Sequence, residues 1–225
     1  MLSKKLLSTC QTADSLLFSV DGTSTADPAP TSVLMAFRNA SFGSVSVETR
    51  DRDDPPAVTT SSGDAVVIAL HYQDDDTRKT PGDSDLPTAA GNAFRYYSSD
   101  TSSGTLTWYN LSPPSSYNVG DITVDAPAGD MGASTVVLNQ SGSNSIEFIG
   151  VDNGNESSTI GTSSPLVTIA NDAISGLQSG DLLLVYISDD FQQTFNSVSD
   201  GWNTGYAITN PSGYSAIALF YKTIP

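Results

Sequence analysis

The chain has 225 residues, of which 9 are Lys or Arg and 25 are Asp or Glu, giving a formal net charge of −16. This acidic balance argues against nucleic acid as a partner, because phosphate groups are bound by clustered basic side chains, and equally against an anionic membrane surface. No apolar run approaches the roughly 20 residues that a membrane-spanning helix requires, so no membrane segment is predicted.

The first ten residues, "MLSKKLLSTC", contain two of the few basic side chains, Lys4 and Lys5. Only four residues separate Lys5 from Cys10, fewer than the roughly 7–15 apolar residues of a signal-peptide core, so no signal peptide is expected. Cys10 is the single cysteine, which excludes an intrachain disulfide. Lys4 and Lys5 are the candidate anchor of an otherwise acidic chain.

The stretch "SGDAVVIALHYQDDD", residues 62–76, predicts a turn at Gly63-Asp64 and then a central β-strand covered on both faces. The glycine suits a positive φ, and the Asp64 carboxylate can accept hydrogen bonds from the turn's own backbone. The only histidine, His71, falls in this strand, and alternation predicts that it lies on a partly solvated face opposite Tyr72. No G-x-S-x-G motif accompanies it, so no catalytic role is expected.

Three acidic loops in the first half offer hard oxygen ligands of the kind that calcium prefers. None matches a calcium-loop consensus, and Arg52, Arg78 and Lys79 lie among the acids, so solvated loop charge is the favoured explanation and calcium binding is the alternative. The calcium candidates are Asp51, Asp53, Asp54, Asp74, Asp75, Asp76, Asp83 and Asp85. No other cofactor is predicted.

Aromatic residues cluster near residues 94–97, 108–109 and 202–206. In a small sandwich, large rings usually fill the core, which is the favoured interpretation, whereas the alternative is that exposed rings stack on sugars. By alternation, Tyr97, Tyr109 and Tyr206 are the candidates for the surface.

The phrase "SGDLLLVYISDD", residues 179–190, nearly repeats the earlier one. Gly180 follows Gly63 by 180 − 63 = 117 residues, Ser145 follows Ser32 by 145 − 32 = 113, and Phe220 follows Trp108 by 220 − 108 = 112. Elements that recur in order at nearly constant spacing indicate an internal repeat. The sequence therefore predicts two tandem modules, residues 1–112 and 113–225, with a linker at about 111–120.

Each module is rich in short alternating strands separated by Gly, Pro, Asn and Asp loops. This pattern is typical of an all-β protein. The predicted fold is two tandem β-sandwich domains of similar topology, immunoglobulin-like or jelly-roll.

The order "TVVLNQSGSNSIEFIGVDNG … SGDLLLVYISDD … GW … SAIALFYKTI" within residues 119–225 resembles a β-sandwich module that recurs in virion proteins of tailed bacteriophages. Residues 14–112 match less well, since "AFRN" replaces "IGVD" and no "GW" is present; the usual proline before the "GW" of residues 119–225 is also missing. The resemblance implies a virion surface or tail component without catalytic residues to carry over.

The leading functional hypothesis is a non-enzymatic virion protein, a capsid decoration (cement) protein or a tail-associated component, located in the virion after synthesis in the host cytoplasm. It would bind other capsid or tail proteins by multivalent docking, as a homo-oligomer on the particle. The alternative is a carbohydrate-binding adhesin or receptor-binding module for a host surface glycan, assisted by calcium. A polysaccharide-acting enzyme ranks last, because it needs two carboxylates facing each other in a cleft.

Overall fold

The computed structural model describes eleven segments of the chain, and all of its regular elements are β-strands. The segments are residues 15–21, 31–48, 55–73, 96–99, 103–119, 131–154, 166–170, 174–189, 194–197, 201–209 and 216–225. Among these residues, no helix has the length and apolar character needed to cross a bilayer. The all-β prediction is confirmed for the described residues.

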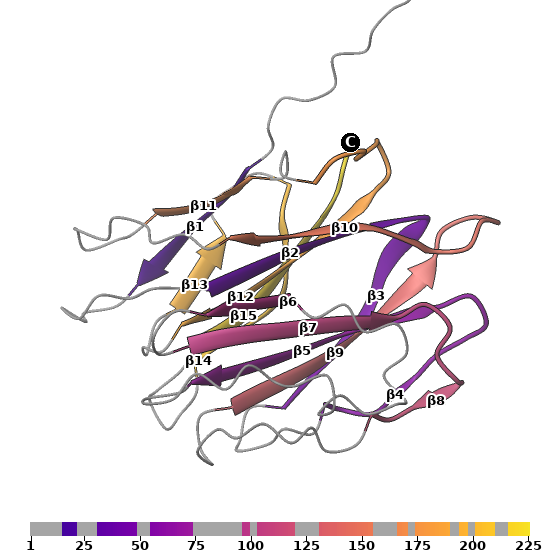
Figure 1. Cartoon of the computed structure of the whole chain (residues 1–225), viewed down its shortest axis with the longest axis horizontal. Helices are drawn as coiled ribbons and strands as arrows, with labels where there is room; N and C mark the ends of the chain where they lie inside the picture. Colours follow the sequence, from indigo (N-terminus) through magenta and orange to yellow (C-terminus); the bar gives the residue numbers. More distant parts are fainter. Residues whose placement is uncertain are drawn as a thin grey trace, which may run out of the picture.

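Two five-stranded sheets carry most of the described chain (Figure 1). Sheet I has the order β10 (Glu147–Gly154), β2 (Thr31–Arg38), β12 (Leu182–Asp189), β15 (Ala216–Thr223), β14 (Asn203–Thr209). Sheet II has the order β3 (Ala40–Glu48), β9 (Met131–Gln140), β5 (Ala65–Gln73), β7 (Ser103–Asn110), β6 (Tyr96–Ser99). A three-stranded sheet contains β11 (Leu166–Ala170), β1 (Ser15–Asp21) and β13 (Thr194–Ser197), and β4 (Val58–Thr59) pairs with β8 (Ser116–Tyr117).

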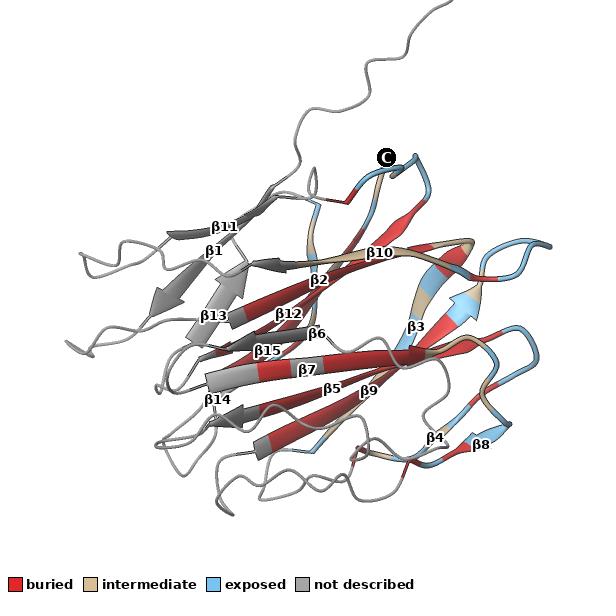
Figure 2. Ribbon diagram, viewed as in Figure 1, coloured by how far each residue is buried: buried red, intermediate tan, exposed pale blue. Residues whose placement is uncertain are grey.

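The two large sheets pack face to face over one apolar core, as in a β-sandwich. Alternate residues of β5 (Ala65, Val67) and of β12 (Leu182, Leu184) point into this inter-sheet core. Figure 2 shows buried residues running along β2, β12, β5 and β9.

The intervening residues of the central strands are buried as well, in two outer clusters. Leu183 packs in a cluster with Ile174, against which Trp202 packs, and Val66 packs in a cluster with Tyr117. The prediction that the two continuous apolar runs form central strands covered on both faces is confirmed.

Each large sheet contains strands from both halves of the sequence. In sheet I, β2 of the first half lies between β10 and β12 of the second half. In sheet II, β9 of the second half lies between β3 and β5 of the first half. The arrangement differs from the predicted tandem sandwiches, each with its own sheets, because each half places its β2 or β9 strand in the sheet of the other.

The two sheets have the same strand order when the halves are exchanged. Replacing β3, β9, β5, β7 and β6 by β10, β2, β12, β15 and β14 converts the order of sheet II into that of sheet I. The registers agree, since Ala65 pairs with Leu138 as Leu182 pairs with Phe37. The 117-residue and 112-residue spacings therefore connect equivalent positions. The match of Ser32 with Ser145 is wrong, because β2 is equivalent to β9 and not to β10.

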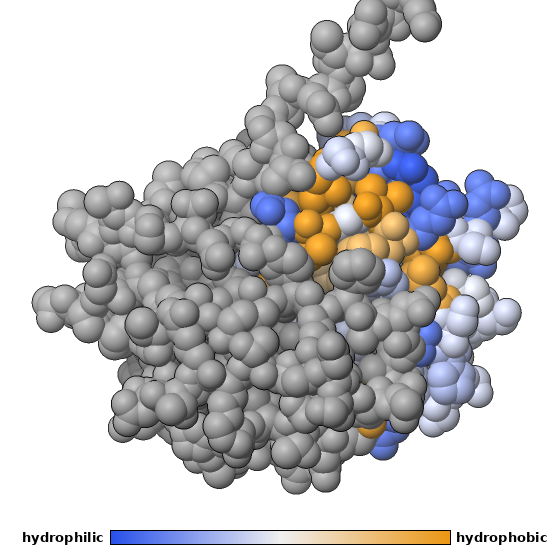
Figure 3. Space-filling view, in the orientation of Figure 1, coloured by the Kyte–Doolittle hydropathy of each residue, from blue (hydrophilic) through white to orange (hydrophobic). Residues whose placement is uncertain are grey.

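Two aromatic stacks repeat this relation. Phe42 of β3 stacks on Tyr221 of β15, with ring centroids 3.8 Å apart and planes at 5°. Phe148 of β10 stacks on Tyr109 of β7 at 4.3 Å and 24°. In both cases an edge strand beside a β-bulge supplies the phenylalanine, and a strand of the opposite sheet supplies the tyrosine. The second stack adjoins the apolar surface along β10 (Figure 3), where residues 148–151 are half-buried.

The Gly-Asp turns before β5 and β12 have the predicted geometry. Gly63 and Gly180 have φ of 91° and 90°, a region that favours glycine. The Asp64 N–H donates to the carbonyl of Ser61 at 3.1 Å, and the Ser61 N–H donates back to Asp64 Oδ2 at 2.7 Å. Asp181 makes the same two bonds with Gln178, at 3.1 and 2.8 Å. The prediction that these aspartates bond the backbone of their own turn is confirmed.

Candidate functional site

The candidate calcium ligands and the candidate anchor fall outside the described residues. These are Asp51, Asp53, Asp54, Asp74, Asp75, Asp76, Asp83, Asp85, Lys4 and Lys5. Tyr97 belongs to β6, but only its backbone is described. Within the described ranges, no three His, Cys, Asp or Glu side chains are close enough to hold a metal ion.

Tyr109 and Tyr206 are buried, at 6% and 7% exposure, so their predicted place on the surface is wrong. Tyr109 alternates with Trp108 as expected, but both faces of β7 are covered. Tyr206 follows a register irregularity between Thr204 and Tyr206. That irregularity breaks the alternation, so that Trp202 packs against an outer cluster while Tyr206 points into the inter-sheet core.

The "GW" tryptophan and the lysine of the last strand, both part of the resemblance to virion modules, lie together. The Lys222 ammonium is 6.0 Å from the centroid of the Trp202 ring. Trp202 packs against the cluster of Leu183 and Phe220 on the outer face of sheet I. In this structure the two motif residues therefore cover the outer face of a sheet.

The described chain brings five polar side chains together inside the inter-sheet core. His71 Nε2 is 3.1 Å from the Tyr206 hydroxyl, which is 2.9 Å from Ser134 Oγ. On the other side of the ring, His71 Nδ1 is 3.3 Å from Thr105 Oγ1, which is 2.7 Å from Ser188 Oγ. His71, Thr105 and Ser134 belong to sheet II, whereas Tyr206 and Ser188 belong to sheet I. The cluster therefore joins the two sheets by hydrogen bonds.

His71 is 1% exposed, so the prediction of a partly solvated face is wrong. Its ring lies 6.2 Å from the ring of Tyr186 and 6.4 Å from that of Tyr206, centroid to centroid. Burial lowers the pKa of His71 from 6.5 to about 3 and raises the pKa of Tyr206 and of Tyr186 above the ordinary value of 10. The imidazole is therefore neutral at pH 7, with one nitrogen donating and the other accepting.

A neutral imidazole permits a single ordered chain of hydrogen bonds through all five groups. The hydroxyl of Ser188 donates to Thr105, Thr105 to His71, His71 to Tyr206 and Tyr206 to Ser134, and the reverse order is equally consistent with the distances. Both orders satisfy the buried groups, which is the condition for a stable polar cluster in a core. The members are 0–7% exposed, so the arrangement fixes the relative position of the sheets and does not present a base to a solvent-borne substrate.

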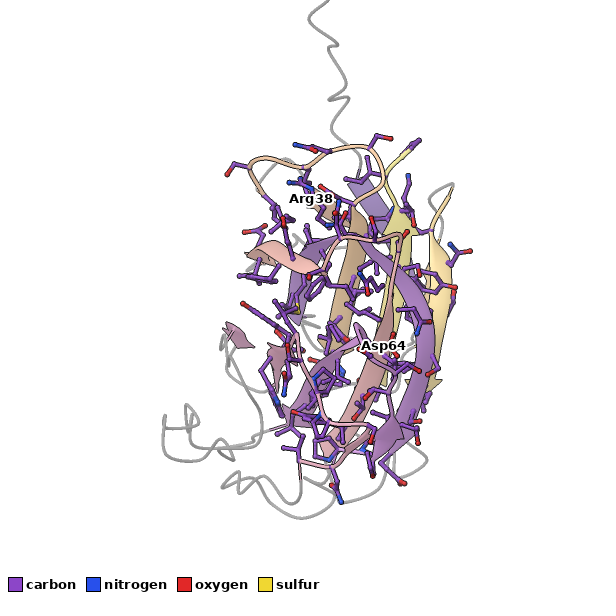
Figure 4. All side chains as sticks on the ribbon, turned by 90° about the vertical axis from the view of Figure 1, so that its right-hand side faces the viewer. Arg38 and Asp64 are labelled. Carbon is purple, nitrogen blue, oxygen red and sulfur yellow. The ribbon has the colours of Figure 1, made fainter. Side chains whose placement is uncertain are left out.

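Two further polar contacts join the halves at the end of the sandwich shown in Figure 4. Arg38 donates from Nε to Asp181 Oδ1 at 3.0 Å and from Nη2 to Asp181 Oδ2 at 2.9 Å. At the equivalent position, Asn139 Nδ2 donates to Asp64 Oδ1 at 3.2 Å. The hydrogen bonds with Asp181 raise the pKa of Arg38 above its ordinary value. At the end of each exchanged strand, a side chain therefore binds the turn aspartate of the other half.

One sequence signal pointed to the polar cluster. His71 and Ser188 are 188 − 71 = 117 residues apart, the spacing of the two Gly-Asp turns. Both therefore occupy the same position of equivalent strands, and both reach Thr105. Ser134 and Tyr206 lie on strands whose partners the sequence does not specify.

Comparisons with family models, with curated proteins and with solved structures gave no match for this chain. The described strands alone define the class of the chain, which is an all-β protein built of antiparallel sheets.

Proposed function

We propose that the chain is a non-enzymatic structural protein of a tailed-bacteriophage virion, either a capsid decoration protein or a tail-associated component. It acts through the shape and charge of its surface, by multivalent docking on other virion proteins as a homo-oligomer. In this proposal the two equivalent halves act together as one interlocked β-sandwich body.

The observation that supports the proposal most is the interlocked pair of equivalent halves. Strands exchanged between sheets, one shared core and several cross-half polar contacts favour a rigid body over a hinged one. The only histidine is enclosed in that core, where it supports packing. A rigid acidic body with a net charge of −16 suits attachment to a repetitive basic or neutral lattice.

The direct test is the location of the chain in purified particles of the phage that encodes it. Quantitative mass spectrometry of gradient-purified virions should find the chain at a fixed copy number per particle. The full chain should also co-sediment with particles that lack it, and a variant without residues 1–12, which include Lys4 and Lys5, should not. Absence from purified particles would contradict the proposal, and co-sedimentation of the truncated variant would contradict the anchor.

The adhesin hypothesis gives a different outcome in a second assay. A glycan array probed with the labelled full chain should show no binding that depends on calcium. Binding that a chelator abolishes would replace the virion-lattice proposal by the carbohydrate-binding one, with the loop aspartates as the ligands to mutate first.

A further inference from the structure

The exchange of strands leaves each half incomplete without the other. Without β9, the strands β3 and β5 of sheet II have no partner between them, and β5 loses the ladder that runs from Ala65–Leu138 to Tyr72–Met131. Without β2, the strands β10 and β12 of sheet I lose theirs in the same way. Each gap would expose backbone N–H and C=O groups beside an apolar face, which is costly in water.

The side chains in these gaps are among the most buried of the described residues. Met35 and Phe37 of β2 are 1% and 0% exposed, and Val136 and Leu138 of β9 are both 0% exposed. All four belong to the single core between the sheets. The exchanged strands therefore contribute apolar, fully buried side chains to the contact between the halves, as in obligate interfaces between subunits, beside the polar cluster around His71.

The same contact has polar groups in equivalent places at its rim. Arg38, at the end of β2, binds Asp181 of the other half, and Asn139, near the end of β9, binds Asp64. An interface in which the same patch is used by both partners is the kind that twofold dimers use. The strand β1 adds a further cross-half pairing, with β11 and β13.

From these relations we infer that the fold is a fused dimer of a half-length unit. Each half is a binding partner for the other: it offers a slot beside its central strand and donates the strand that fills the partner's slot. The covalent connection between Val119 and Met131 serves to keep the halves at a high effective concentration and is dispensable for the folded structure. This inference is independent of the proposed virion role.

The test uses the full chain with a protease recognition sequence inserted between Val119 and Met131, cleaved after folding. The two fragments should elute as one particle with the mass of the intact chain, and native mass spectrometry should find a 1:1 complex with an unchanged far-UV circular dichroism spectrum. The Tm of the cleaved protein should fall by roughly 3–5 °C on tenfold dilution, because unfolding now separates two molecules. The same insertion variant without protease should show no such dependence.

A pair of substitutions in the cleaved protein locates the interface. Arg38→Ala removes a cross-half contact and should raise the dissociation constant of the fragments about 30-fold. Asn110→Ala removes a side-chain bond to the Ser112 N–H within the first half and should leave the dissociation constant within about threefold. Elution of two separate folded particles of half mass, or loss of folded structure on cleavage, would overturn the inference.

Discussion

Arg38 and Asp181, 143 residues apart in the sequence, form a bidentate ion pair at 2.9–3.0 Å that joins the two halves of the chain. The Asp181 side chain is 2% exposed and that of Arg38 is 26% exposed. The same Arg38 Nη2 also donates to the carbonyl of Gly176 at 2.9 Å. The pair therefore connects the end of β2 with both the turn and the loop that precede β12.

Arg38→Ala should lower the free energy of unfolding by about 2 kcal/mol, because the buried Asp181 carboxylate then keeps only the Gln178 N–H as a described partner. The cost is lower than for a fully buried ion pair, because the Arg38 side chain is 26% exposed and water can reach its place. Asn139→Ala, at the equivalent position, removes a single longer bond and should cost about 1 kcal/mol. Urea denaturation at pH 7 measures both. Equal costs for the two variants would show that the ion pair adds nothing beyond the neutral contact.

The two turn glycines form a matched pair for a second experiment. Gly180→Ala places its Cβ in open space and should cost about 1–2 kcal/mol, through backbone strain alone. Gly63→Ala has the same strain, and its Cβ would also meet the side-chain oxygen of Gln140, which is held by its bond to Asn144. The second variant should therefore be less stable than the first.

The difference between the glycine variants has its own control. Adding Gln140→Ala to Gly63→Ala removes the obstructing group. The stability loss of the double variant should therefore not exceed the sum of the losses measured for the single variants Gly180→Ala and Gln140→Ala. Thermal denaturation of the four variants measures this. A persistent extra loss would mean that the clash with Gln140 is not its cause.

Tyr206 and Tyr186 test the polar cluster, because both are buried but only one hydroxyl is bonded among the described groups. Tyr206→Phe leaves His71 Nε2 and Ser134 without that hydroxyl and should cost about 1–3 kcal/mol. Tyr186→Phe removes an oxygen that has no hydrogen-bond partner in the described part of the chain, so stability should stay within about 0.5 kcal/mol or rise. Chemical denaturation decides, and the reverse ranking would contradict the assigned hydrogen bonds.

Stability should fall in acid because of His71. Its pKa is about 3 in the folded protein and about 6.5 in the unfolded chain, so only the unfolded state binds the proton between these values. Between pH 7 and pH 5 this should remove about 2 kcal/mol from the free energy of unfolding. His71→Gln should remove most of that pH dependence, whatever it does to stability at pH 7. Identical slopes in the two proteins would show that His71 does not titrate as its burial requires.

The sequence predicted local structure well wherever one strand or turn determines it. The Gly-Asp turns need only a glycine with positive φ and a carboxylate three residues after the bonded N–H, and both are present in the letters. The strands 65–73 and 182–189 are central because their apolar residues run without interruption. Trp108 packs in an outer cluster of sheet II, as expected for a large ring in a small sandwich.

The sequence did not predict which strands lie side by side. Alternation sets which residues share a face, but it carries no information on the neighbouring strand, so the exchange of β2 and β9 could not be foreseen. Tyr109 and His71 were misplaced for a related reason, since a strand covered on both faces has no solvated side. The bulge before Tyr206 inserts a residue that strict alternation does not anticipate.

The exchange of strands can be tested most directly with engineered disulfides in a Cys10→Ser background. Ala69 of β5 and Ser134 of β9 are register partners from different halves, so the variant with Cys at both positions should oxidise to an intramolecular disulfide. Ala207 and Ala218, partners within the second half, give the positive control, and Ala69 with Ala218, on different sheets, gives the negative one. Mass spectrometry under non-reducing conditions should find the Ala69–Ser134 variant as fully closed as the positive control. Free thiols in that variant beside a closed positive control would contradict the interlocked halves.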